Sequence, residues 1–361
     1  MKKTLIIATL FMVAAYTANC QFQRTPTPND NLKSVEANVD GSVTFRIYAP
    51  QAESVSLSVD IRSIGAETNK LENGVWEIVV PNIADGAYRY NFVVDGVTVY
   101  DPKYPRIADI KPVASISRNQ ESAFWAQKDV PHGALSQIYY KSTTMGTTRR
   151  MHIWTPPGYN ASSDKLPVLY LIHGGGDNDA AWPGVGCANW ILDNLLANGK
   201  MVPMIVVIPD GSISTDLFTD EMMKDIVPYI EKNYRVLTDK DHRAIAGLSM
   251  GGLETLNVFM AYPDKFAYIN VMSSGWFKDN KEMMDSGDKR LGEISSTLAK
   301  NVKLLKFTQG GPEDIAYENC KEMLKLFDKN GIKYQFSEMP GGHTFHVWRH
   351  DLYSFAQAIF K

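Results

Sequence analysis

The stretch AIAGLSMGGLET, residues 244–255, constrains the fold of this chain more than any other part of its sequence. A run of small apolar residues, typical of a buried strand, ends at Gly247-Leu248-Ser249-Met250-Gly251, and helical spacing follows. In so sharp a strand-turn-helix connection, glycines avoid collision with neighbouring backbone, and the serine hydroxyl is presented beyond the strand. Ser249 is therefore a candidate nucleophile, and it needs a base because a free hydroxyl reacts poorly near pH 7.

The residues from 126 to 361 have the pattern of an α/β domain. Continuous apolar runs each end in glycine or polar residues: LPVLYLIHGGG, MVPMIVVIPDG, HRAIAGLSMGG, AYINVMSSG and VKLLKFTQGG. Continuous hydrophobicity indicates strands buried on both faces, and the segments between them have helical spacing. We therefore predict a mainly parallel sheet, with ligands bound beyond the carboxyl ends of its strands. Together with the serine turn, this pattern predicts the α/β-hydrolase fold.

The preceding residues, 35–125, consist of short alternating runs such as GSVTFRIYAP, SVSLSVD and GVWEIVVP, separated by turn residues. Period-two alternation with this punctuation predicts antiparallel strands, and so many short strands indicate a β-sandwich. The pair Asp95-Gly96 predicts a hairpin, because these residue types accept the positive φ angles of such turns. A chain of 361 residues is long enough for two such domains.

The first 20 residues, MKKTLIIATLFMVAAYTANC, predict a secretory signal peptide, because their apolar run is too short to cross a bilayer. Cleavage after Cys20 is the preferred interpretation and a lipid-modified Cys20 the alternative. Both predict a secreted or periplasmic protein, in which residues 21–34 form a linker. Past the signal, only Cys187 and Cys320 remain, which favours two buried thiols over a bridge or a metal site. The formal net charge of −3 offers no field to recruit nucleic acid or an anionic membrane.

Candidate partners for Ser249 follow it in the order acid, then histidine, that this fold uses. His343 lies behind two glycines in a loop after the last strand-like run, and the two later histidines fall in or near a helical segment. The acid is Glu313 or Asp314, because both lie in the loop GGPEDIAYE after the preceding strand. The residues alone do not separate these two carboxylates.

The segments RAIAGLSMGG, LYLIHGGGDN, GGPEDIAYE and GGHTFHVWR together resemble the carbohydrate esterases of family 1, which include feruloyl and acetylxylan esterases. That family is similar to enterochelin esterases and S-formylglutathione hydrolases. The resemblance covers roughly residues 130–361 and implies Ser249 as nucleophile, His343 as base and Asp314, rather than Glu313, as acid. This chain has Gly-Pro-Glu-Asp where relatives often have Gly-x-Asn-Asp or Gly-Lys-Glu-Asp, a departure that keeps the acid.

The segment YRYNFVVDGVTVYDP resembles the immunoglobulin-like carbohydrate-binding modules of family 48. The resemblance extends over the predicted sandwich and implies a module that holds polysaccharide. Trp76, Tyr88, Tyr90 and Phe92 at alternating spacing are explained equally well as core and cross-strand packing.

An oxyanion hole of two backbone N–H groups would complete the site. We expect one donor from Met250, the residue after the nucleophile, and the other from Gly175 in HGGGD rather than from Gly174. The position of His173 in the family motif implies that it shapes this loop. No metal, nucleotide or flavin cofactor is implied, because HGGGDN lacks the Lys-Ser/Thr of a phosphate-binding loop.

The expected substrate is an acylated plant polysaccharide such as xylan, from which a serine esterase would remove hydroxycinnamoyl groups. Three alternatives stay open: an acetylxylan esterase, a catechol-siderophore esterase, and an inactive hydrolase that binds carbohydrate. Trp182 follows the oxyanion loop and Trp276 follows the NVMSSG strand, so both could contact substrate, although scaffold packing explains each as well.

Overall fold

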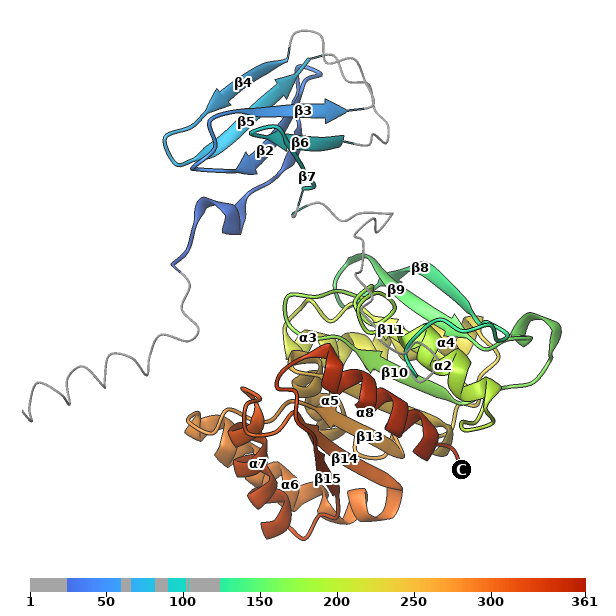
Figure 1. Cartoon of the computed structure of the whole chain (residues 1–361). Coiled ribbons are helices and arrows are strands. Elements are labelled where there is room, and N and C mark those ends of the chain that lie inside the picture. The colour runs from blue at the N-terminus through green and yellow to red at the C-terminus, as the bar shows by residue number, and fades with distance from the viewer. Residues whose placement is uncertain (1–24, 60–65, 82–89, 102, 104–123) are drawn as a thin grey trace, which may run out of the picture. The chain divides into compact units, whose positions relative to one another are not determined.

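The computed structural model describes residues 25–59, 66–81, 90–101, 103 and 124–361 (Figure 1). The predicted signal peptide, with Cys20, lies outside the described residues. The chain divides into two compact units, Met1–Ile110 and Lys111–Lys361. Phe124 and Trp125, which the sequence-based boundary assigns to the sandwich, pack against the core of the second unit.

The first unit confirms the predicted β-sandwich. A short 3-10 helix, η1 (Pro28–Asn31), precedes two antiparallel sheets, and the side chains of Phe45, Ile78 and Phe92 are buried between them. The first sheet has the order β1 (Val35–Ala37), β2 (Val43–Tyr48), β5 (Val75–Val80), β4 (Glu67–Lys70), and the second β3 (Val55–Val59), β6 (Tyr90–Val94), β7 (Val97–Val99).

The predicted hairpin joins β6 and β7. Asp95 and Gly96 have φ angles of 48° and 83°, and Val94 pairs directly with Val97, as a two-residue turn with positive φ requires. Of the four aromatic residues considered above, Trp76 and Phe92 are buried, Tyr90 is partly buried, and Tyr88 lies outside the described residues. The buried pair therefore packs in the sandwich core.

The second unit confirms the α/β-hydrolase fold, with eight strands in one sheet (Figure 1). The six strands from β15 to β11 pair in parallel, and β9 and β8 extend the sheet in antiparallel pairing. The strand order is β15 (Gln335–Glu338), β14 (Leu304–Gln309), β13 (Tyr268–Met272), β12 (Arg243–Leu248), β10 (Val168–Ile172), β11 (Ile205–Pro209), β9 (Thr147–Thr155), β8 (Ala134–Ser142).

Helices cover both faces of this sheet. One face packs against α3 (Thr215–Glu221), the π-helical turn η3 (Met222–Ile226), α4 (Val227–Asn233), α5 (Met250–Ala261), α6 (Lys281–Asn301) and α7 (Tyr317–Lys329). The other face packs against α2 (Ala188–Ala197) and α8 (Phe345–Ala358). Two short 3-10 helices, η2 (Tyr159–Ala161) and η4 (Lys240–His242), lie in connecting segments.

Burial on both faces explains the continuous apolar runs. In β10, Val168, Tyr170 and Ile172 contribute to one core, whereas Leu169 and Leu171 contribute to the other. Because side chains alternate across a strand, a sheet covered on both sides needs an apolar residue at every position. The loops that follow the parallel strands then meet at one edge of the sheet.

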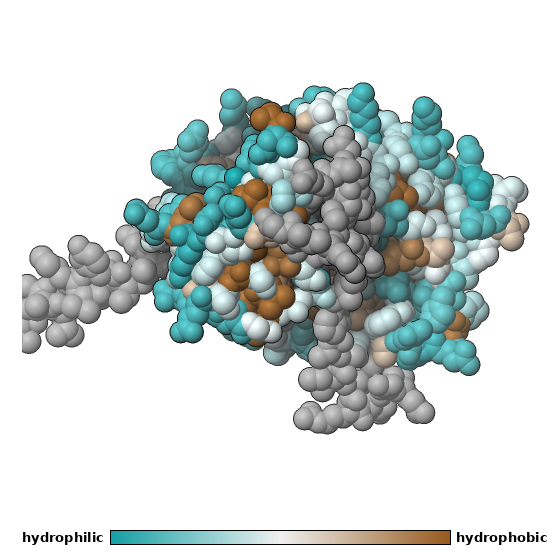
Figure 2. Space-filling view, turned by 90° about the horizontal axis from the view of Figure 1, so that it is seen from above, coloured by the Kyte–Doolittle hydropathy of each residue, from teal (hydrophilic) through white to brown (hydrophobic). Residues whose placement is uncertain are grey.

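Both cysteines past the predicted signal, Cys187 and Cys320, are free and buried. No helix within the described ranges is long and apolar enough to cross a bilayer. On the face shown in Figure 2, hydrophilic residues predominate and hydrophobic ones form a few separate groups.

Candidate active site

Ser249 lies in a strained turn between β12 and α5. Its φ and ψ angles are 53° and −117°, a conformation that non-glycine residues rarely adopt. A Cβ on Gly247 would lie 2.1 Å from the carbonyl oxygen of Gly251, and a Cβ on Gly251 would lie 2.2 Å from the carbonyl oxygen of His173. The glycines therefore permit a turn that no side chain at those positions would fit.

The tertiary structure brings His343 and Asp314 to this serine. His343 Nε2 lies 2.9 Å from Ser249 Oγ, and His343 Nδ1 lies 2.8 Å from Asp314 Oδ1. Each residue comes from the loop after a different strand: Ser249 from β12, Asp314 from β14 and His343 from β15. This chain of hydrogen bonds has the connectivity with which a serine hydroxyl gives its proton to an imidazole.

The environment of Asp314 favours its ionised form. The carboxyl group is buried, which by itself raises its pKa, but hydrogen bonds from His343, Ser273 and the backbone N–H of Ala316 outweigh burial and lower the pKa. The Ala316 N–H lies 2.9 Å from Oδ1, and the Gly310 N–H lies 3.2 Å from Oδ2. A carboxylate fixed in this way holds the imidazole in one orientation and stabilises its positive charge.

Two residues that the sequence did not single out brace the acid and the base. Ser273, at the end of β13, has a φ of 43°, and its Oγ accepts a hydrogen bond of 2.8 Å from the indole N–H of Trp348. The Trp348 ring also packs edge-on against His343, with ring centroids 5.0 Å apart. In the sequence, Ser273 is only a serine that follows a strand, and Trp348 is only a tryptophan in the helix after His343. Neither pattern is specific enough to predict a role in the site.

The remaining polar residues considered from the sequence lie beside this chain of hydrogen bonds. Glu313 is exposed and accepts a 3.0 Å hydrogen bond from the Gly341 N–H, which fastens the loop that carries His343. His346 and His350 lie on α8, where their rings contact each other at a centroid distance of 5.3 Å. Of the two acids, it is Asp314 that contacts the imidazole.

The glycine-rich loop after β10 lies directly against the serine turn. A Cβ on Gly174 would lie 3.1 Å from Ser249 Cβ, and a Cβ on Gly175 would lie 3.0 Å from Met250 Cγ. The two residues expected to supply oxyanion donors, Gly175 and Met250, are thus in contact. Backbone N–H groups at such a junction are suited to a negative charge that develops on a carbonyl oxygen.

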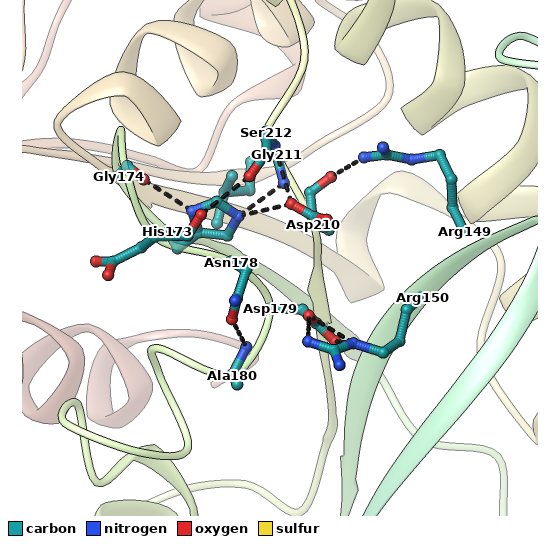
Figure 3. A network of polar contacts seen from close by, with 12 residues as sticks. Arg149, Arg150, His173, Gly174, Asn178, Asp179, Ala180, Asp210, Gly211 and Ser212 are labelled. Atoms are coloured by element: carbon teal, nitrogen blue, oxygen red, sulfur yellow. Dashed lines mark hydrogen bonds and ion pairs between the residues drawn. The ribbon is translucent and has the colours of Figure 1, made fainter. Parts of the chain in front are cut away.

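His173 contacts the carbonyl group of Gly174 in this loop (Figure 3). Its Nδ1 lies 2.8 Å from the Gly174 carbonyl oxygen, and its Nε2 lies 2.8 Å from the backbone nitrogen of Gly211. A carbonyl only accepts and a backbone N–H only donates, so Nδ1 carries a proton and Nε2 accepts from Gly211. Nε2 also has a longer contact, 3.3 Å, with Asp210 Oδ1. Gly211 follows Asp210, whose carbonyl accepts a hydrogen bond from Arg149 of β9.

A second anchor fixes the far part of the same loop (Figure 3). Asp179 is fully buried and receives a bidentate pair of hydrogen bonds from Arg150, from Nε to Oδ2 at 3.0 Å and from Nη2 to Oδ1 at 2.6 Å. His152 Nδ1 also lies 2.8 Å from Asp179 Oδ2. Arg150 and His152 both belong to β9. Asp179 therefore connects the loop that carries the candidate oxyanion donors to two residues of this strand.

Comparison with known proteins identifies the family to which this chain belongs. The family model described as "Putative esterase" matches residues 142–358 of the chain. The chain belongs to this esterase family. A second model, carbohydrate-binding module 48 (isoamylase N-terminal domain), matches residues 34–104 of the sandwich.

The relatives of this esterase include enzymes named for feruloyl ester hydrolysis. An endo-1,4-beta-xylanase/feruloyl esterase of Xylanibacter ruminicola is 30% identical over 345 residues, which cover 90% of this chain and 45% of that protein. The chain thus spans less than half the length of that relative. A solved ferulic acid esterase is 25% identical with a TM-score of 0.57, over 63% of this chain and 98% of the other. The enterobactin esterase of Shigella flexneri shares the fold, at 15% identity and a TM-score of 0.52, over 88% of this chain and 92% of the other.

The two tryptophans considered as substrate contacts in the esterase domain are both buried. Trp182 is fully buried, donates its indole N–H to the Ile172 carbonyl at 3.1 Å and packs edge-on against Phe345, which argues for scaffold packing. Trp276 is 4% exposed and packs so closely on α6 that a Cβ on Gly287 would lie 2.4 Å from its ring. Its remaining surface lines a cleft between α5 and α6.

Proposed function

We propose that this protein is a secreted or periplasmic serine esterase that removes hydroxycinnamoyl groups, such as feruloyl, from plant cell-wall polysaccharide. The observation that carries this proposal is the hydrogen-bonded chain of Ser249, His343 and Asp314 at an edge of the sheet that is rimmed with exposed apolar side chains. The Xylanibacter ruminicola relative supports the same substrate class.

The apolar rim favours an aromatic acyl group over acetate. Seven large hydrophobic side chains are exposed among the described residues of the esterase domain, and five of them come from segments that follow five parallel strands, β10 to β14. These five are 39–61% exposed: Val185, Leu217, Met250, Phe277 and Ile315. Parallel strands place such segments at the edge where Ser249 lies, so an aromatic acyl group would find apolar surface there, whereas acetate would leave most of it exposed.

The mechanism follows from the three side chains. His343 Nε2 accepts the proton of Ser249 as the hydroxyl oxygen attacks the ester carbonyl, and ionised Asp314 stabilises the imidazolium. The Gly175 and Met250 N–H groups donate to the oxyanion. His343 then gives its proton to the departing alcohol, which leaves an acyl-enzyme on Ser249. Water repeats the sequence and releases the hydroxycinnamic acid.

The kinetic test compares two esters on one enzyme preparation. We expect a higher kcat/KM for methyl ferulate than for acetate release from acetylated xylan, and loss of both activities in Ser249→Ala with unchanged circular dichroism. Preferential acetate release would make the protein an acetylxylan esterase. An active alanine variant would overturn the assignment of the nucleophile.

A catechol-siderophore esterase is the second candidate, because the fold shared with the Shigella flexneri enterobactin esterase extends over most of this chain. Faster hydrolysis of a cyclic catecholate triester than of methyl ferulate would favour it. The bonded geometry of Ser249 and His343 argues against an inactive hydrolase that only binds carbohydrate.

A further inference from the structure

The mechanism above leaves unused a cleft of about 420 Å³ between α5 and α6. Leu253 and Asn257 line it from α5, Glu282 and Ser286 line it from α6, and Trp276 lines it from the segment after β13. A volume of this size falls within the range of about 300–1,000 Å³ that is usual for small-molecule sites.

The cleft begins close to the nucleophile. The backbone N–H of Leu253 donates to the Ser249 carbonyl at 3.2 Å, so the first lining residue of α5 lies one helical turn beyond the serine. Thr215 begins α3 and Asn280 caps α6, and both also line the cleft at the catalytic edge of the sheet. The mouth of the cleft therefore lies at the same edge of the sheet as Ser249.

Met260 and Arg290 line the end of the cleft that lies farthest along α5 and α6. Arg290 of α6 donates from Nε and Nη2 to the carbonyl oxygen of Met260, at 3.0 and 2.9 Å. Its guanidinium also contacts Glu293 at 3.2 Å. Because these contacts occupy the guanidinium, Arg290 is poorly placed to bind a phosphate or carboxylate.

The lining has the chemistry of a carbohydrate site. Leu253, Met260 and Trp276 provide apolar surface, which matches the C–H faces of a sugar ring. Asn257, Glu282 and Ser286 provide an amide, a carboxylate and a hydroxyl that can pair with sugar hydroxyl groups. An aromatic acyl group offers these polar groups few hydrogen-bond partners, whereas a sugar offers several hydroxyl groups.

We propose that the α5–α6 cleft binds the saccharide portion of the ester substrate, an inference that rests on the proposed function. The acyl group then lies on the apolar rim, and the sugar to which it is esterified enters the cleft. The structure thereby separates the two halves of the substrate into sites of different chemistry.

The test fills the cleft in the full-length chain. Ser286 is exposed on the cleft side of α6, so Ser286→Trp should block the cleft, and Ser296→Trp, at an exposed position of α6 outside the cleft lining, is the matched control. We expect Ser286→Trp to lower kcat/KM for a feruloylated xylooligosaccharide at least tenfold, mainly through KM, and to change methyl ferulate hydrolysis less than twofold. The control should match the wild type on both substrates.

A second variant removes polarity without adding heavy atoms. Asn257→Leu should weaken the oligosaccharide reaction and spare methyl ferulate, with an unchanged melting temperature as the folding control. Equal rates for the wild type and both cleft variants on the oligosaccharide would overturn the proposal.

If the wild type hydrolyses neither ester, the proposed function fails and binding decides the cleft separately. Calorimetric titration with unesterified xylooligosaccharide should then show one binding site fewer in Ser286→Trp than in Ser296→Trp. Identical titrations would overturn the cleft as a saccharide site.

Discussion

Two substitutions of His173 should separate its hydrogen bond to Gly174 from its hydrogen bond to Gly211. In His173→Asn, the side-chain amide can still donate to the Gly174 carbonyl from the position of Nδ1, but the Gly211 N–H loses its acceptor. In His173→Gln, the longer amide can still accept from Gly211, but the Gly174 carbonyl loses its donor. If His173 serves catalysis by orienting the Gly174-Gly175 peptide, Gln should impair turnover and Asn should not.

The expected magnitudes follow from the burial of the site. His173 is 2% exposed, so either variant leaves one buried polar group unpaired, at a cost of about 1–3 kcal/mol in the free energy of unfolding. A peptide bond is planar and trans, so rotating the Gly174 carbonyl also rotates the N–H of Gly175. Loss of one oxyanion donor lowers kcat by about 10²–10³-fold, which is the upper limit here because the donor is displaced rather than removed. We expect at least a tenfold loss for Gln.

The assay measures kcat and KM for methyl ferulate together with urea unfolding of each variant. The expected result is a similar loss of stability in both variants, a selective fall of kcat in His173→Gln, and a KM within about threefold of the wild type. Equal values of kcat for the Asn and Gln variants would refute the positioning role. Loss of the hydrogen bond to Gly174 would then lower turnover no more than loss of the hydrogen bond to Gly211.

Three further predictions concern the acid, a buried glutamate and the sandwich. Asp314→Asn should lower kcat by up to about 10⁴-fold, because loss of the carboxylate charge or a misoriented imidazole impairs proton transfer. Glu313→Gln should keep most activity. A larger loss in Glu313→Gln than in Asp314→Asn would identify Glu313 as the acid. Burial and the charge of Asp210 raise the pKa of Glu254 from 4.5 to about 9, so the folded state keeps a proton that the unfolded chain loses, and stability falls as pH rises across this interval. In Glu254→Gln, the free energy of unfolding, measured with urea at pH 5 and pH 8, should differ less between the two pH values than in the wild type. The same difference in both proteins would contradict the raised pKa of Glu254. A chain beginning at Lys111 should retain methyl ferulate hydrolysis but hydrolyse feruloylated xylan more slowly, because a sugar-binding sandwich raises the effective substrate concentration. Equal losses on both substrates, with a lower melting temperature, would instead mean that the sandwich supports the esterase fold.

The sequence by itself determined the features that depend on a few consecutive residues. The glycines around Ser249 specify a turn that excludes side chains, and Asp95-Gly96 specifies a two-residue hairpin, because backbone sterics at such positions admit few alternatives. Continuous and alternating apolar runs predicted the two fold classes, because the period of hydrophobicity reports whether one or both faces of a sheet are covered. The order of nucleophile, acid and base along the chain followed from the predicted fold, whereas the choice of Asp314 over Glu313 came from the family resemblance. The catalytic roles of Ser249, Asp314 and His343 stay predictions.

The tertiary structure alone decided which distant side chains meet. Periodicity shows that a residue is buried but not what it contacts, so nothing in the sequence linked Ser273 to Trp348, or distinguished the fully buried Trp182 from a substrate contact. The lining of the α5–α6 cleft likewise includes the close packing of Trp276 on Gly287, which lie on separate elements. Such contacts arise when whole helices and strands pack together, so a local sequence pattern does not predict which distant residues will be in contact.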